Sequence, residues 1–237
     1  MAIRVGIGRH SPSSPPRGIR GRRVLTTSAG FPARRPGPAD QAEPRTERAR
    51  TQLARLLQLA YSGELAAARA YLGHRHSLTD RVERAELWAI ICDEVRHRTC
   101  LLDMLSELGT VPDPARERKM ERVGRAISRF CQVGGWFFPM YGAGRLESQN
   151  IREYELAARL AHVAELHRFV APFLEMAEVE WEHERYFKSK AARHRLWRHI
   201  PSWPAPPPRE QIRASFRAFE TTAAWEVPVV RPPWLVR

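Results

Sequence analysis

Residues 173–187 read FLEMAEVEWEHERYF, and their apolar side chains recur at the spacing of a helix. One face of this helix, beginning at Phe169, four residues before the quoted stretch, holds six residues at steps of four, three, four, three and four: Phe169, Phe173, Met176, Glu180, His183 and Phe187. Such a stripe predicts a helix whose apolar face packs against other helices. Glu180 and His183 lie in the middle of this stripe, one above the other. A carboxylate and an imidazole in that arrangement can bind one metal ion.

A second helical pattern carries the same pair on its apolar face, at Glu94 and His97. Its face also holds Leu87, Ile91, Leu101 and Leu105. Two further patterns each place one Glu among apolar residues: Glu64 with Leu53, Leu57, Ala60, Ala67 and Tyr71, and Glu147 with Ile151, Tyr154, Ala158 and Ala161. The single Glu precedes the Glu-x-x-His pair by 30 residues in the first half of the chain and by 33 in the second. The repetition indicates two halves of one site.

Carboxylates on apolar faces need positive partners, because each unpaired buried ion costs several kcal/mol even after the protein relaxes. Two divalent metal ions would bring four positive charges. The spacing therefore predicts a two-metal site with the ligands Glu64, Glu94, His97, Glu147, Glu180 and His183. Oxygen and imidazole ligands suit iron, with manganese as an alternative. Glu153 and Glu155 compete with Glu147 for its position, and the mirrored spacing favours Glu147.

Helical periodicity dominates the middle of the chain, with almost no strand signal. We expect helices at about 46–73, 80–108, 114–131, 143–167 and 171–198, separated by glycine and proline. The sequence thus predicts an all-α four-helix bundle spanning 46–198, with an extra apolar helical hairpin segment between its halves. Histidines outside the two pairs, which include His74, are expected on the surface or in loops.

The two ends of the chain differ from its middle in composition. Residues 1–45 are rich in Arg and Pro, and we expect a disordered extension there. Residues 199–237 form a Pro-rich tail with one short helical pattern at 210–219, either an ordered wrap or a loose tail. The net charge is +8 over residues 1–50 and +7 over 188–237, but −2 between them. A near-neutral middle argues against specific nucleic-acid binding, although the basic tails can contact RNA or anionic lipid.

Three cysteines without a C-x-x-C pair fit the reduced thiols of a cytoplasmic protein. Residues 130–144 are aromatic, apolar and flanked by Arg129 and Arg145, yet too short to span a bilayer. We expect this segment to form a peripheral contact with the inner face of a membrane; a capping hairpin is the alternative. The sequence is also compatible with a homo-oligomer.

These residues resemble the demethoxyubiquinone hydroxylase family of ferritin-like di-iron proteins. The resemblance rests on SGELAAARAYLGH at 62–74, DEVRH at 93–97, the Gly-rich stretch 133–144 followed by Glu147 and Tyr154, and EWEH at 180–183. It covers roughly residues 50–190. His74 stands where the family has Gln, and Glu153 stands where it has His.

The resemblance implies a ferritin-like bundle with Glu147 as the fourth-helix ligand and with Glu94 and Glu180 bridging two irons. It implies a monooxygenase that uses O2 and an external electron donor to hydroxylate a hydrophobic, quinone-like aromatic substrate. Tyr154 would then hydrogen-bond a ligand or carry an electron; the alternative role is a core aromatic.

Three other functions compete with this hypothesis. A rubrerythrin-like or ferritin-like protein would use the same ligands for peroxide reduction or iron oxidation. A di-iron tRNA hydroxylase would suit the basic tails. A metal-stabilised helical module could instead bind a partner through its Pro-rich tail.

Overall fold

The computed structural model describes residues 43–222 and 225–231, and this part of the chain is helical, without a β-strand. Its α-helices are α1 (Arg45–Ser77), α2 (Arg81–Glu107), α3 (Pro114–Val133), α4 (Phe137–Val163), α5 (Val170–Ala191) and α6 (Glu210–Glu220), with the short 3₁₀ helices η2 (His167–Phe169) and η3 (Arg195–His199). The expected all-α fold is confirmed for these residues. The disorder expected at 1–45 lies almost entirely outside them. No helix in the described ranges is both long and apolar enough to cross a membrane.

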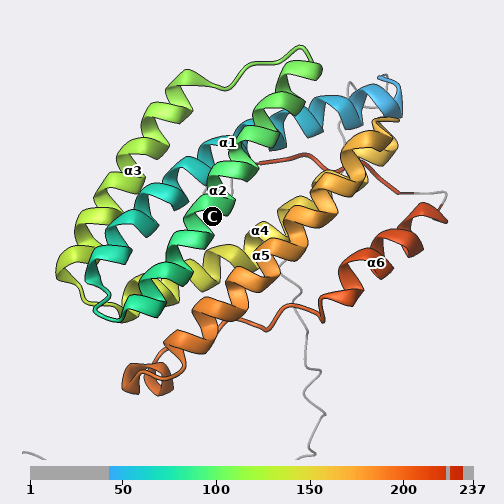
Figure 1. The fold of residues 1–237 in the computed structure, drawn as a ribbon. Coiled ribbons are helices and arrows are strands. Elements are labelled where there is room, and N and C mark those ends of the chain that lie inside the picture. The colour runs from blue at the N-terminus through green and yellow to red at the C-terminus, as the bar shows by residue number, and fades with distance from the viewer. Residues whose placement is uncertain (1–42, 223–224, 232–237) are drawn as a thin grey trace, which may run out of the picture. The chain divides into compact units, whose positions relative to one another are not determined.

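Helices α1 and α2 form one antiparallel hairpin, and α4 and α5 form a second (Figure 1). Helix α3 connects the hairpins by running back along α1. Because α3 returns the chain, α4 begins beside the end of α1 and runs antiparallel to it. Two contacts between side chains show this direction: Tyr71 meets Glu147, whereas Glu64, earlier in α1, meets Tyr154, later in α4.

Local sequence accounts for the starts of α2 and α3. The carboxylate of Asp80 accepts a hydrogen bond from the backbone N–H of Glu83 (2.8 Å), which caps α2. Asp113 caps α3 in the same way, through the N–H of Ala115 (2.9 Å), and Pro114 occupies the first position of that helix. Proline fits there because its missing N–H would have no partner inside the helix.

Residues 130–144 do not form the separate hairpin that the sequence suggested. Helix α3 continues to Val133, a turn follows at Gly134 and Gly135, and α4 begins at Phe137, six residues earlier than expected. Pro139 lies in the first turn of α4, where a proline is tolerated, so it does not mark a break before the helix. Gly135 has a φ of +72°, which explains a glycine at this turn.

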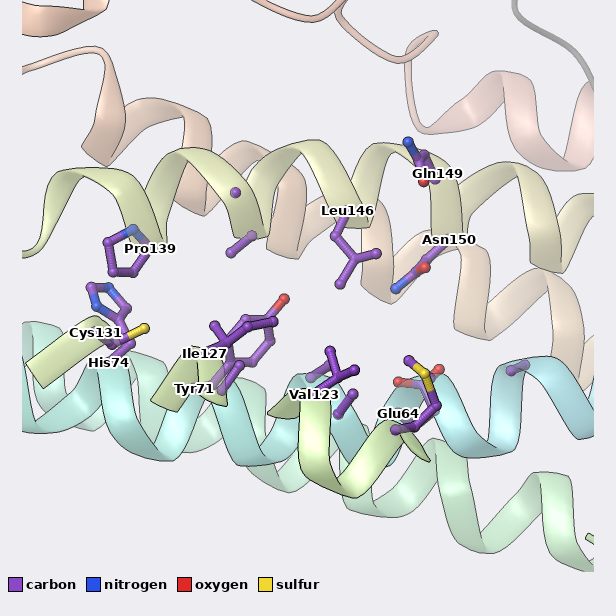
Figure 2. A pocket seen from close by; sticks show the side chains of 18 of the residues that line it. Glu64, Tyr71, His74, Val123, Ile127, Cys131, Pro139, Leu146, Gln149 and Asn150 are labelled. Carbon is purple, nitrogen blue, oxygen red and sulfur yellow. The ribbon is translucent and has the colours of Figure 1, made fainter. Parts of the chain in front are cut away.

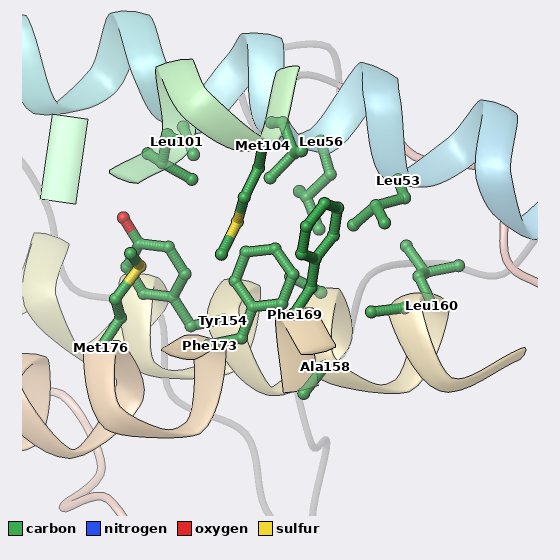
Figure 3. Close-up of a cluster of buried hydrophobic side chains, with 14 of the residues drawn as sticks. Leu53, Leu56, Leu101, Met104, Tyr154, Ala158, Leu160, Phe169, Phe173 and Met176 are labelled. Atoms are coloured by element: carbon green, nitrogen blue, oxygen red, sulfur yellow. The ribbon is translucent and has the colours of Figure 1, made fainter. Parts of the chain in front are cut away.

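Apolar side chains fill the space between the helices on both sides of the polar site. One cluster lies towards the start of α1 and includes Leu53, Leu101, Tyr154 and Phe173 (Figure 3). The other lies towards the end of α1 and includes Leu87, Ile91, Phe137, Met140 and Phe187. The expected apolar faces of α1, α2, α4 and α5 therefore all point into the interior.

The tail packs against the helices as an ordered wrap within the described residues. Ile212 and Phe216 of α6 are buried, and Arg213 forms a two-pronged ion pair with Glu178 of α5 (2.6 and 3.0 Å). Further along, the backbone N–H of Val230 donates to the side chain of Gln52 in α1 (2.8 Å). These contacts tie the tail to both hairpins.

Another part of the tail approaches α4 at Gly144. A Cβ atom there would lie 2.6 Å from the ring of Trp203, which is closer than such atoms can come, so a glycine is required. The indole N–H of Trp203 in turn donates to buried Glu184 (2.7 Å). The tail is thus fitted to α4 and α5 within one turn of Glu147.

Candidate metal centre

Six buried side chains from four helices meet at the centre of the fold. They are Glu64 from α1, Glu94 and His97 from α2, Glu147 from α4, and Glu180 and His183 from α5. Each has no more than 4% of its surface exposed. These are the six residues that the sequence predicted as ligands, and the fold brings all of them together.

Two overlapping groups with the geometry to hold metal ions exist among the described residues. One contains Glu64, Glu94, His97 and Glu180, and the other contains Glu94, Glu147, Glu180 and His183. Within each group, the candidate ligand atoms all lie within 4.8 Å of one another. Glu94 and Glu180 belong to both groups. Each group therefore has three carboxylates and one imidazole, and two of the carboxylates are shared.

The polar atoms of this cluster lie close together without hydrogen-bonding one another. His97 Nδ1 is 3.0 Å from Glu180 Oε1, and His183 Nδ1 is 3.4 Å from Glu94 Oε1. Yet both nitrogens, and all four carboxylate oxygens of Glu94 and Glu180, lack a well-directed hydrogen bond. Buried polar groups normally have partners. Metal ions would supply them, so the donor set fits a cation.

Burial and mutual repulsion explain the protonation of the metal-free cluster. Burial raises the pKa of Glu94 and of Glu147 well above the usual value, and the charge of Glu180 raises both further. Burial also acts to raise the pKa of Glu180, but His183 and His97 outweigh it and hold that pKa low. Metal binding would therefore displace protons from carboxyl groups and imidazoles.

Two tyrosines donate hydrogen bonds to the outer carboxylates in a crossed pattern. Tyr71 of α1 donates to Glu147 of α4, and Tyr154 of α4 donates to Glu64 of α1. Asn150 also donates to Glu147 (2.8 Å). The sequence had predicted a ligand contact only for Tyr154. The position of Tyr71, seven residues after Glu64 as Tyr154 is seven after Glu147, was the overlooked signal.

Asp93 orients one of the two imidazoles. Its Oδ2 lies 3.3 Å from Nε2 of His183, whose Nδ1 faces the carboxylate cluster. A carboxylate at the far nitrogen is typical of histidines that bind metals, because it sets the tautomer and increases the basicity of the ligand nitrogen. Asp93 therefore supports the second group.

An apolar cavity of about 470 Å³ lies between α1, α3 and α4 and reaches the cluster at Glu64 (Figure 2). Its walls are mostly aliphatic and include Val123, Ile127 and Leu146. Polar groups gather at the two ends. Glu64, Gln149 and Asn150 lie at one end, and His74 with Cys131 lies at the other (Figure 2).

Other sequence-based expectations for polar residues have mixed outcomes. Glu153 and Glu155, the competitors of Glu147, belong to neither group; Glu153 lines the cavity instead, where burial raises its pKa to about 7. The expectation of a surface position for His74 was wrong, because only 1% of it is exposed. His76 on the same helix is exposed, as expected.

Comparison of the chain with protein-family models, with curated proteins and with solved structures found no match.

Proposed function

We propose that this protein is a ferritin-like, di-iron carboxylate monooxygenase. The observation that carries the proposal is the pair of ligand groups that share Glu94 and Glu180. Proteins of the di-iron and di-manganese class use one Glu from each of two helices and a Glu-x-x-His pair from each of two others, all facing the interior of a four-helix bundle. Helices α1, α2, α4 and α5 supply that set, with α3 as the crossover between hairpins.

Bound iron would supply the reaction with O2, in which a substrate C–H, O2, two electrons and two protons give C–OH and water. An external donor would provide the electrons. The chain holds the ligands in place through Tyr71, Tyr154 and Asp93. The aliphatic walls of the cavity exclude water from the side of Glu64 and leave space there for an apolar substrate.

The cavity supports a hydrophobic, quinone-like substrate. The cavity extends along α1 from Leu59 to His74. These residues are fifteen positions apart, which corresponds to about 22 Å at the helical rise of 1.5 Å per residue. Charged side chains occur only near the carboxylate end, at Glu64, Arg116 and Glu153. An aromatic head group beside Glu64 with an apolar extension along α1 would fit this distribution.

Exposed apolar side chains on α3 and α4 support peripheral membrane contact, and all of them except Val133 also line the cavity. They are Val123, Ile127, Phe130, Val133, Phe138 and Leu146, each at least 37% exposed. Helix α3, which carries most of them, also has six Arg or Lys and two Glu. Cations beside apolar side chains favour anionic lipid surfaces. Phe137, which the sequence had offered for this role, is buried against His194 instead.

Anaerobic reconstitution with ferrous iron tests the metal centre directly. We expect about two irons per chain, and a loss of iron on replacing Glu147 by Ala. Glu155→Ala is the matched control, because Glu155 lies on the same helix outside both groups. Absence of iron binding in the folded wild-type protein would contradict the proposal.

Turnover distinguishes the monooxygenase from a peroxide reductase. With a chemical reductant, ¹⁸O2 and a short-chain benzoquinol, the product should contain ¹⁸O, measured by mass spectrometry. Ile127→Trp, which adds bulk to the cavity wall from α3, a helix that carries none of the six candidate ligands, should abolish this product and leave the iron content unchanged. Rapid peroxide consumption without ¹⁸O incorporation, in both proteins alike, would assign the site to the rubrerythrin-like class.

Binding to vesicles tests the membrane contact separately. We expect the wild-type protein to bind vesicles of phosphatidylcholine and phosphatidylglycerol, and the double variant F130S/F138S to bind more weakly. Val82→Ser, at an exposed apolar residue at the start of α2, is the control. Equal binding by all three proteins would remove this part of the proposal.

A further inference from the structure

His74 presents an unpartnered nitrogen at the end of the cavity remote from the carboxylates. The side chain lines the cavity, only 1% of the residue is exposed, and Nε2 has no hydrogen-bond partner among the described residues. Figure 2 shows its ring at the end of the cavity occupied by Cys131 and Pro139. A buried polar atom without a partner is destabilising, so a partner from the cavity's occupant would be favourable.

The other side of the ring determines which kind of partner Nε2 can take. Nδ1 of His74 lies 3.0 Å from the hydroxyl oxygen of Ser77. That hydroxyl donates its single proton to the backbone carbonyl of His74 (2.7 Å). Ser77 can therefore only accept from the ring, which places the imidazole proton on Nδ1. In a neutral ring with that tautomer, Nε2 carries a lone pair and is an acceptor.

Burial keeps the ring neutral. It lowers the pKa of His74 from 6.5 to about 4. Around neutral pH the imidazole therefore has one proton, and Nε2 does not donate. Cys131, which lies at the same end of the cavity, is a weak hydrogen-bonding group, and burial raises the pKa of its thiol to about 11.

We propose that the cavity binds an elongated apolar molecule that carries a hydroxyl group at its far end, and that this hydroxyl donates a hydrogen bond to Nε2 of His74. The inference rests on the proposed function for the identity of the other end, which lies at Glu64. His74 is ten residues beyond Glu64 on α1, so the two ends of the molecule are about 15 Å apart along the helix axis. His74 is then a specificity-determining residue for the substrate.

The position of His74 depends on a close contact between α1 and α3. A Cβ atom at the neighbouring Gly73 would lie 2.4 Å from the backbone of Ser128 in α3, so only glycine permits this approach. The contact holds the end of α3 against α1 and thereby closes this end of the cavity with Ile127 and Cys131. Nε2 consequently faces the occupant and not solvent.

Two isomeric probes test the proposal without turnover. 1-Dodecanol can donate a hydrogen bond, whereas 1-methoxyundecane has the same atoms and cannot. Their affinities are measured by displacement of the fluorophore N-phenyl-1-naphthylamine from the full-length protein. We expect the wild-type protein to prefer the alcohol about three- to tenfold, the usual effect of one hydrogen bond.

Substitutions assign that preference to the imidazole. His74→Leu should bind both isomers equally, whereas His74→Gln should keep part of the preference because its amide oxygen can accept. His76→Leu, at the exposed histidine of the same helix, should behave like the wild type. If His74→Leu fails to fold, Ser77→Ala serves in its place: it frees Nδ1, allows the other tautomer and should reduce the preference.

A spectroscopic measurement separates a hydrogen bond from a change in shape. In protein labelled with ¹⁵N-histidine, the Nε2 resonance of His74 should have the shift of an unprotonated nitrogen and should move on addition of the alcohol, but not of the ether. Equal affinities in the wild type, or an unchanged preference in His74→Leu, would overturn the proposal.

Failure of this proposal and failure of the proposed function give different results. The binding measurement is made on both the metal-free and the iron-loaded protein. A chain that distinguishes the isomers but takes up no iron would overturn the di-iron function and leave the hydroxyl site standing. A chain that takes up iron but binds the isomers equally would overturn the hydroxyl site at His74 and leave the di-iron function standing.

Discussion

The two halves of the site are built on one plan, and two of the differences between them bear on its surroundings. In each half a Glu and a Tyr seven residues later occupy one helix, and a Glu-x-x-His pair occupies the next. The two tyrosines of the repeat donate crossed hydrogen bonds, from Tyr71 to Glu147 and from Tyr154 to Glu64. The repeat is matched by two similar groups of candidate ligands in a single core.

The first difference is the residue before each Glu-x-x-His pair. It is Asp93 in the first half, which contacts His183, but Val179 in the second, which has no polar side chain to offer His97. The second difference lies ten residues after the single Glu. It is His74 in the first half and Ala157 in the second. Both differences concern the surroundings of the site, whereas the single Glu and the Glu-x-x-His pair occur in both halves.

The largest effect should come from removing a carboxylate that both halves share. Glu180→Ala takes a ligand from both groups, so we expect iron to fall from about two per chain to near zero. Glu64→Ala affects one group and should leave part of the iron bound. Metal analysis after anaerobic reconstitution measures both. The exposed Glu182 on the same helix gives the control Glu182→Ala, and an equal loss of iron in all three variants would refute the shared-ligand arrangement.

The next effect concerns the dependence of stability on pH at His74, whose counterpart in the second half is Ala157. The pKa of His74 is near 6.5 in the unfolded chain, whereas burial lowers it to about 4 in the folded protein. Stability should therefore fall as pH decreases from 6.5 to 4, by on the order of 3 kcal/mol. Urea unfolding of the metal-free protein at several pH values measures this.

The His74→Gln variant isolates that contribution from the carboxylates. It lacks the titrating ring, so the wild-type protein should lose more stability than the variant over this pH range. Parallel curves for the two proteins would show that His74 is not buried in its neutral form.

A smaller effect should distinguish the two imidazoles. Asp93→Asn weakens the orientation of His183 alone, and we expect metal affinity at that group to fall about 10- to 100-fold. Stepwise titration with Mn²⁺, followed by electron paramagnetic resonance, resolves the two affinities. Asp103→Asn, at an exposed position on the same helix, should leave both unchanged. Equal weakening of both sites by Asp93→Asn would contradict the assignment of Asp93 to His183 alone.

The smallest effects should come from the crossed tyrosines. Tyr71→Phe and Tyr154→Phe each leave one buried carboxylate without its hydroxyl donor, at a cost of about 1–3 kcal/mol in the free energy of unfolding. Chemical denaturation measures it. Glu147 keeps Asn150 as a donor when Tyr71 is replaced, whereas the second carboxylate oxygen of Glu64 has no hydrogen-bond partner among the described residues, so Tyr154→Phe should cost more than Tyr71→Phe. Equal costs would show that the bond from Asn150 does not compensate for the lost hydroxyl.

The sequence predicted which polar residues meet in the interior because a helix places residues three and four apart on the same face. The apolar stripes that contain Glu94, His97, Glu180 and His183 could be read without knowing any contact between helices. The start of α4 was harder to predict. Pro139 is a helix breaker in the interior of a helix but acceptable in its first turn, so local sequence leaves both interpretations open.

The sequence by itself determined the helices, their inward faces and the six residues that meet at the centre, because each of these depends on periodicity along one helix. Only the tertiary structure decided the crossed tyrosines, the contact of Asp93 with His183, the cavity and the burial of His74. All of these depend on how α1, α3, α4 and α5 approach one another. Periodicity indicates which face of a helix is buried, but the partner of each buried side chain follows from packing between residues far apart in the chain.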